Sequence, residues 1–191
     1  MKPRILMLAL ATCGLALAGE ESARPSPDSA PAAAAAAAQA LGAALKAELE
    51  AAVHNGGPVA ALGVCQLKAP DIAARISAES GLRVSRTSLR PRNPDNAPNA
   101  WQTEVLRTFE ARKAAGEDPA YLSYSAVVDG EFRFMKAIPT APVCLTCHGE
   151  RLAPEVTARL AELYPQDQAT GFRLGDLRGA FVIVKPAAAR P

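Results

Sequence analysis

A chain of 191 residues is long enough for one domain of ordinary size with short extensions. Hydrophobic residues make up 49% of it, but alanine inflates that share and aromatic residues contribute only 5%, so the apolar core is short of large side chains. The formal net charge is only +2, which argues against nucleic acid or an anionic membrane surface as the partner.

The first 18 residues have the three parts of a secretory signal peptide. Lys2 and Arg4 form a basic start, residues 5–17 are apolar, and Ala16-Leu17-Ala18 is a cleavage site of the A-x-A type. The apolar run is too short to span a bilayer comfortably. We therefore expect export to the periplasm without stable membrane insertion. Removal of this segment leaves equal numbers of basic and acidic residues.

An alternative is a lipoprotein anchored through Cys13, with residues 10–13 as the lipidation box. Thr12 is unfavourable immediately before the cysteine, and the apolar run continues past it. We therefore expect the soluble form, and anchoring through Cys13 is the second choice.

The mature chain begins with residues 19–31, which are polar and contain prolines, and we predict a disordered leader there. Residues 32–53 predict a helix with an apolar stripe, and Asn55-Gly56-Gly57-Pro58 predicts its end. Residues 59–66 form a short apolar run, which fits either a buried strand or a continuing helical segment.

The following segments alternate between helical and strand patterns. Residues 71–80 predict a helix that ends at Gly81, and Asn99 predicts the N-cap of another helix. Asp129-Gly130 joins two β-rich runs, which is a strong hairpin signal. The predicted helices are 71–80, 101–115 and 154–163; the predicted strands are 82–89, 121–128, 131–138 and 179–185, with 90–99 irregular.

This order of elements predicts one α+β domain over residues 32–188, built on an antiparallel sheet with helices to one side. The last strand, 179–185, is continuously apolar, and we expect it at the centre of the sheet.

The most informative motif is Cys144-Leu145-Thr146-Cys147-His148, the C-x-x-C-H signature of covalent haem attachment. Two thiols at this spacing can each bond a haem vinyl group, and the histidine that follows can ligate the iron. Thioredoxin-like redox chemistry, a zinc site and chance occurrence are the alternatives. A zinc site needs a fourth ligand, and only His54 and Cys65 remain for it.

Three separated blocks carry a further resemblance: SLRPRNPDNAPNAW at 88–101, FMKAIPTAPVCLTCHG at 134–149 and YPQDQATGFRLGDLRGAF at 164–181. In this order they resemble an extracytoplasmic haem-binding domain family, formerly a domain of unknown function and often fused to bacterial signalling proteins. The resemblance covers about residues 41–185. It implies a PAS-like fold, with antiparallel sheet and flanking helices, and one covalent haem c held by Cys144, Cys147 and His148.

The second iron ligand is less clearly marked. Met135, His54 and Cys65 are the candidates that remain in the mature chain. Cys65 is an odd cysteine in an oxidising compartment, where it is either a buried inert thiol or an iron-bound thiolate. The resemblance implies a place for Cys65 in a strand that faces the haem, and we therefore predict iron ligation by His148 and Cys65.

A covalent haem also carries two propionates that need donors. Arg90 and Arg92 flank Pro91 and suit carboxylates, and Trp101 is expected to pack on or near the porphyrin. We therefore add Arg90, Arg92 and Trp101 to the predicted cofactor-binding residues. Arg173 and Arg178, in the third block, are further candidates for the propionates. A solvated surface role is the alternative for each arginine.

Two functions fit these observations. The first is a sensor or binding module that responds to redox state or to a diatomic gas, nitric oxide or carbon monoxide, and passes its output through a signalling protein. The second is a soluble periplasmic electron carrier with a redox partner protein. An enzyme would need an acid–base group at an open distal site, and with only His54 spare we expect none.

Overall fold

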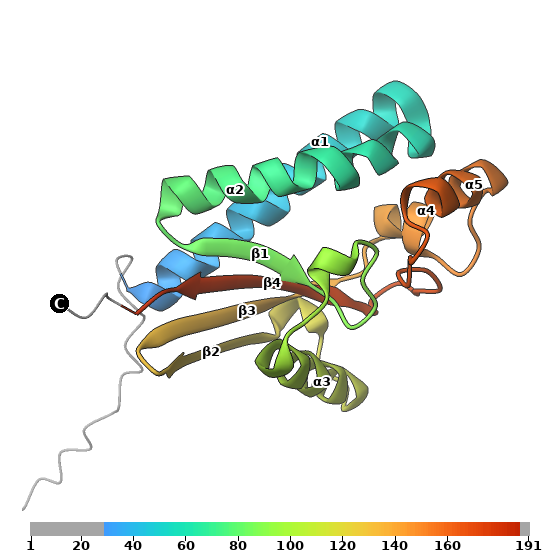
Figure 1. Cartoon of the computed structure of the whole chain (residues 1–191). Coiled ribbons are helices and arrows are strands. Elements are labelled where there is room, and N and C mark those ends of the chain that lie inside the picture. The colour runs from blue at the N-terminus through green and yellow to red at the C-terminus, as the bar shows by residue number, and fades with distance from the viewer. Residues whose placement is uncertain (1–28, 188–191) are drawn as a thin grey trace, which may run out of the picture.

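The structure, a computed structural model, describes residues 29–187, apart from the side chain of Cys65 (Figure 1). The predicted signal peptide, Cys13 and most of the predicted leader lie outside the described residues. Ser29 caps the first helix, since its Oγ accepts a hydrogen bond from the Ala32 amide at 3.4 Å. The last two residues of the predicted leader, Ala30 and Pro31, therefore already belong to a helix.

The elements follow one another in a mixed order that confirms the α+β class. The α-helices and strands are α1 (Ala30–Gly63), α2 (Ala69–Ser80), β1 (Arg83–Thr87), α3 (Ala100–Ala114), β2 (Ser123–Val128), β3 (Glu131–Pro139), α4 (Leu145–His148), α5 (Pro154–Leu163) and β4 (Leu177–Lys185). Short 3-10 or π-helical turns are η1 (Val64–Lys68), η2 (Pro94–Asn96), η3 (Pro119–Tyr121) and η4 (Pro142–Cys144).

The four strands form one antiparallel sheet in the order β1-β4-β3-β2. The predicted central position of the last strand is confirmed, because β4 pairs with both β1 and β3. The predicted hairpin is also confirmed: β2 and β3 are joined by Asp129 and Gly130, at φ 52° and 77°. These left-handed conformations suit an Asp-Gly turn between twisted strands.

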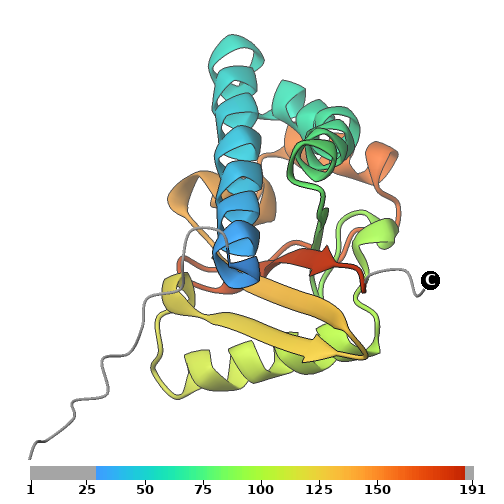
Figure 2. The same ribbon diagram turned by 90° about the vertical axis from the view of Figure 1, so that its left-hand side faces the viewer.

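Helices cover both faces of the sheet, so the expectation of helices to one side is wrong (Figures 1 and 2). Side chains alternate along β3: Phe134 joins the core under α1 and α2, and its neighbour Met135 joins the core against α3. The alternation of apolar residues on both faces of β3 and β4 is what requires a second helical cover.

The predicted helix stop at residues 55–58 is a sharp break inside α1 rather than its end. Gly57 has φ 72° and ψ −173°, which are not helical, and Pro58 starts the next helical turn. The rest of α1, η1 and α2 then run back along the first part of α1 (Figure 1).

Residues 59–66 are therefore helical, and the strand predicted for Cys65 is wrong. The backbone of Cys65 lies in the π-helical turn η1, and its side chain is outside the described part of the structure. A short apolar run carries no periodicity that separates a buried strand from a buried helical segment. Across residues 29–187, no helix combines the length and apolar character needed to span a membrane.

Two local signals fixed the helix ends as predicted. Gly81 ends α2 in the left-handed conformation, and its amide bonds the carbonyl of Ser77. Asn99 caps α3 through a reciprocal pair of 3.1 Å hydrogen bonds with Gln102.

Gly179 in β4 is a strict requirement of the sheet. Its φ is +155°, and a Cβ atom there would lie 2.3 Å from the backbone oxygen of Thr87 on the neighbouring strand. We expect Gly179→Ala to lower the free energy of unfolding by about 3 kcal/mol, measured by urea denaturation followed by circular dichroism.

Gly175→Ala is the matched control, because Gly175 also has a positive φ, +79°, but nothing lies within 4 Å of an added Cβ. Its expected loss is about 1 kcal/mol, from the backbone conformation alone. Equal losses in the two variants would contradict the clash with Thr87.

Candidate functional site

A cavity of about 280 Å³ lies between the helical layer and the end of the sheet next to α4. The predicted apolar stripe of the first helix forms one wall, through Leu45, Leu49 and Val53. Leu62, from the part of α1 that follows the break at Gly57, and Phe181 from β4 contribute further apolar lining. The cavity therefore offers a largely apolar space of the kind that holds an organic cofactor.

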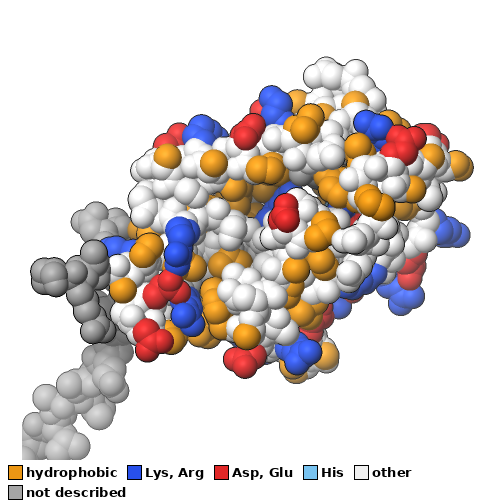
Figure 3. Space-filling view, in the orientation of Figure 1, with side chains coloured by type: hydrophobic (Ala, Val, Ile, Leu, Met, Phe, Trp, Pro, Cys, Tyr) orange, Lys and Arg blue, Asp and Glu red, His pale blue; other side chains and the backbone are white. Residues whose placement is uncertain are grey.

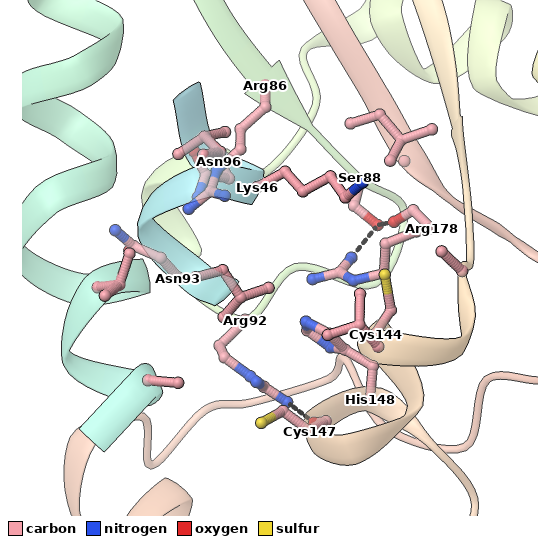
Figure 4. A pocket seen from close by; sticks show the side chains of 18 of the residues that line it. Lys46, Arg86, Ser88, Arg92, Asn93, Asn96, Cys144, Cys147, His148 and Arg178 are labelled. Carbon is pink, nitrogen blue, oxygen red and sulfur yellow. Dashed lines mark hydrogen bonds between the residues drawn. The ribbon is translucent and has the colours of Figure 1, made fainter. Parts of the chain in front are cut away.

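The predicted attachment motif lies at this cavity. Cys144 ends η4, and Cys147 and His148 belong to the single turn of α4. All three line the cavity, and Figure 4 shows the imidazole and both sulfur atoms on the same side of it. The structure thus brings together the three residues that the sequence motif predicted.

Hydrogen bonds fix the orientation of His148. Its Nδ1 lies 2.6 Å from the carbonyl oxygen of Ala169, which can only accept, so Nδ1 carries the proton. The other ring nitrogen, Nε2, is then left as an acceptor with a lone pair. Burial lowers the pKa of His148 well below its usual value, and the nearby cations Arg178 and Arg92 lower it further. The imidazole is therefore neutral at neutral pH, as a metal ligand must be.

The backbone that follows His148 is tied to residues 171–172. The amide of Phe172 donates to the carbonyl of His148 at 2.9 Å, and the amide of Gly171 donates to the carbonyl of Gly149 at 2.8 Å. Gly149 is required here because a Cβ atom would come 2.5 Å from the carbonyl oxygen of Leu145. The motif is thus held as a rigid loop against the segment that also supplies Ala169.

Arg92 is 6% exposed and holds this arrangement together. Its Nε bonds the Asp167 carboxylate at 3.1 Å, and its Nη2 donates to the carbonyls of Cys147 at 2.5 Å and Ala169 at 3.3 Å. Arg92 lines the cavity, as expected of a cofactor-binding residue. Its hydrogen bonds, however, go to Asp167, Ala169 and Cys147 of the attachment motif. The sequence did not predict that Arg92 holds the motif in place.

Arg90 and Trp101 do not line the cavity. Arg90 donates to the carbonyls of Gln168 and Thr170, and its guanidinium lies 4.2 Å from the centre of the Phe172 ring. Trp101 packs against Tyr124 on the α3 side of the sheet, because α3 covers the opposite face. The structure therefore gives both residues contacts outside the predicted site.

Two of the three candidates for the second ligand also lie elsewhere. Met135 is completely buried on the α3 side of β3, and His54 is exposed on α1. Cys65 immediately follows Val64 and lies three residues beyond Leu62, and both of these line the cavity. Among the described residues, no group of three or more His, Cys, Asp or Glu side chains forms a protein-only metal site.

Several cavity residues were missed from the sequence. Lys46 and Arg86 contribute cations, and Ser88 accepts a hydrogen bond at 3.3 Å from the guanidinium of Arg178, a further propionate candidate from the sequence that also lines the cavity. Lys46, Arg86 and Ser88 come from α1, β1 and the loop after β1, and nothing in their local sequence marks them. Only the register of β1 with β4, in which Arg86 faces Phe181, would have indicated one of them.

The family model and the solved structure that match this chain carry the same name, Tll0287. Residues 21–186 match the family model described as Tll0287-like. The crystal structure of the cyanobacterial heme-protein Tll0287 matches with a TM-score of 0.64 and 25% sequence identity, over 82% of this chain and 94% of that one. No curated protein matches.

The Arg92 contacts lead to a stability prediction. Arg92→Leu leaves the Asp167 carboxylate, only 11% exposed, without its cation and removes the donor to the motif loop. We expect the free energy of unfolding to fall by about 3–5 kcal/mol, measured by urea denaturation.

Arg173→Leu serves as the control, because it breaks an exposed ion pair with Glu150. Its expected cost is below about 1 kcal/mol. A similarly small cost for Arg92→Leu would show that the buried pair does not hold the loop.

Proposed function

The chain belongs to the Tll0287-like family, and on this premise we propose that it is a haem-binding, cytochrome-like protein with one haem c attached covalently. Cys144 and Cys147 provide the two thioether bonds, and His148 provides an iron ligand. The family assignment agrees with the resemblance seen in the sequence. The haem protein Tll0287 of the comparison supports haem as the cofactor.

One observation carries this proposal: both thiols and the imidazole line a single, largely apolar cavity, and Nδ1 of the imidazole already bonds the carbonyl oxygen of Ala169. A hydrogen bond from Nδ1 to a backbone carbonyl is the usual way to orient an iron-binding histidine, because it leaves Nε2 for the metal. The residues present therefore fit a covalently bound haem. When bound, haem supplies one-electron iron chemistry and a site for small diatomic ligands.

We propose Cys65 as the second iron ligand. Its neighbours in the chain, Leu62 and Val64, line the cavity, whereas Met135 is buried on the other face of the sheet and His54 is exposed. A π-helical turn such as η1 is frequently found at functional sites. A cysteine bound to iron is deprotonated outright, and the cations at the cavity favour that anion.

The role that we propose is a periplasmic module that responds to redox state or to nitric oxide or carbon monoxide. A thiolate that leaves the iron on reduction would make a two-state element of this kind. Its output requires a partner protein for signalling, and the proposal assigns neither catalytic turnover nor nucleic acid to the chain. Export rests on the signal-peptide pattern of residues 1–18, and covalent haem attachment takes place outside the cytoplasm.

The alternative is a soluble electron carrier. The fixed orientation of His148, through Ala169, Phe172 and the Arg92 contacts, favours this role, since a rigid ligand reorganises little on electron transfer. A carrier keeps both iron ligands in both redox states, whereas a sensor changes one of them.

Covalent attachment is tested on protein matured with a cytochrome c assembly system. We expect the wild-type haem to resist extraction by acidified acetone, and the double variant Cys144→Ala, Cys147→Ala to lose all resistant haem. Thr146→Ala, in the same loop and without a thiol, is the control and should retain it. Complete extraction from the wild type would exclude the c-type assignment.

The role is tested with absorption spectra of the oxidised and dithionite-reduced protein, with and without carbon monoxide. We expect the reduced wild type to bind carbon monoxide, because in the proposed sensor Cys65 would leave the iron on reduction. A reduced protein whose spectrum does not change with carbon monoxide would favour the electron carrier.

The ligand itself is tested by Cys65→Ser, which should change the Soret and near-infrared bands of the oxidised protein. Met135→Leu is the control, because it nearly conserves volume in a core on the other side of the sheet, and its spectrum should match the wild type. An oxidised Cys65→Ser spectrum that matches the wild type would exclude Cys65 as the ligand.

A further inference from the structure

The charges at the cavity are all of one sign. Lys46, Arg86, Arg92 and Arg178 line it, and within residues 29–187 no Asp or Glu side chain does so. A concave site with several cations and apolar walls concentrates positive potential. Such a site is suited to an occupant that combines a large apolar body with anionic groups.

Arg92 and Arg178 bond the protein around the motif. Arg92 bonds Asp167 and two backbone carbonyls. Arg178 donates to Ser88 Oγ and to the carbonyl of Arg90, and its guanidinium lies 5.2 Å from the centre of the Phe172 ring. In Figure 4 both guanidinium groups lie close to His148, which places them at the attachment end of the cavity.

Lys46 and Arg86 lie away from that end. Figure 4 shows the end of the Arg86 side chain near Asn96 and that of Lys46 near Ser88, on the far side of Arg92 and Arg178 from Cys147 and His148. They come from α1 and β1, the two elements that enclose the cavity there.

The fold explains why these two cations line the cavity. Arg86 lies two residues after the buried Val84 and directly opposite Phe181, so its side chain is on the sheet face covered by α1. Lys46 lies between the cavity residues Leu45 and Leu49 and makes an exposed ion pair with Glu50 at 3.6 Å. Because both side chains of this pair are exposed, breaking the pair costs little free energy. The Lys46 ammonium can therefore bind another anion instead.

We propose that Lys46 and Arg86 form the binding site for the haem propionates. This inference rests on the proposed covalent haem. The vinyl groups of haem lie on the edge of the macrocycle opposite the propionates, so thioether bonds at Cys144 and Cys147 direct the two carboxylates toward the other end of the cavity. Lys46 and Arg86 supply charge-assisted donors there. Arg90, which the sequence suggested for this role, lies outside the cavity, and Arg92 holds the motif loop.

The inference has a consequence for the redox behaviour. A cation beside a propionate keeps the carboxylate ionised and disfavours the more positive, oxidised iron. Loss of Lys46 or Arg86 therefore lowers the midpoint potential and raises the pKa of the propionate. The other titratable groups that face this space are Arg92, Arg178, His148 and Tyr164, with Asp167 bonded to Arg92 and Glu50 to Lys46, because thioether bonds would consume the thiols of Cys144 and Cys147.

The experiment compares Lys46→Met and Arg86→Met with two matched controls. Lys68→Met removes an exposed lysine paired with Glu48, and Arg83→Met removes the other arginine of β1, which pairs with Glu131. Neither control residue lines the cavity. The midpoint potential of each haem-loaded protein is measured between about pH 5 and 9, together with the propionate bending band in its resonance Raman spectrum.

We expect both cavity variants to have a lower midpoint potential at neutral pH. The pH range over which the potential changes should move upward by about one pH unit, because the pKa of the propionate rises. The propionate band should move in both, and neither control should show either change. Potentials and Raman bands equal to the wild type in both cavity variants would overturn this inference while leaving covalent haem intact. A wild type without acid-resistant haem would instead overturn the proposed function.

Discussion

The buried guanidinium of Arg92 joins its own loop to two distant parts of the chain, the attachment motif and residues 167–169. It bonds Asp167, the carbonyl of Cys147 in the attachment motif, and the carbonyl of Ala169. Ala169 also accepts the Nδ1 hydrogen of His148. A buried loop carbonyl that has no hydrogen-bond donor destabilises the fold. A guanidinium offers five N–H donors in a fixed geometry. The direction of the imidazole therefore depends on an ion pair that is outside the motif itself.

Features set by neighbouring residues could be predicted from the sequence. The Asp129-Gly130 turn, the Asn99 cap and the Gly81 helix end each depend on a backbone conformation that those residues adopt easily, and all three were confirmed. The C-x-x-C-H spacing likewise brings Cys144, Cys147 and His148 together, because one short turn suffices to place them. The central strand was predictable because both of its faces are apolar.

Features that depend on tertiary contacts could not be predicted in the same way. The run around Cys65 is too short to reveal its period, and the break at Gly57 lets it fold back as a helix. Arg90 and Arg92 flank the same proline, yet one lies over Phe172 and the other is buried at Asp167. Trp101 was assigned to the cavity because nothing in the sequence shows that α3 covers the opposite face of the sheet.

The positive field of the cavity acts on each of its chemical groups in a different way. Burial and the nearby Arg178 and Arg92 lower the pKa of His148, so the imidazole stays neutral and keeps the lone pair that a metal needs. The same cations attract anions. These are the thiolate proposed for Cys65 and the haem propionates proposed to bind Lys46 and Arg86. One set of charges thus keeps His148 unprotonated and would stabilise the negative charge of the thiolate proposed for Cys65. An Asp or Glu at this cavity would weaken both effects, and none is among the described residues that line it.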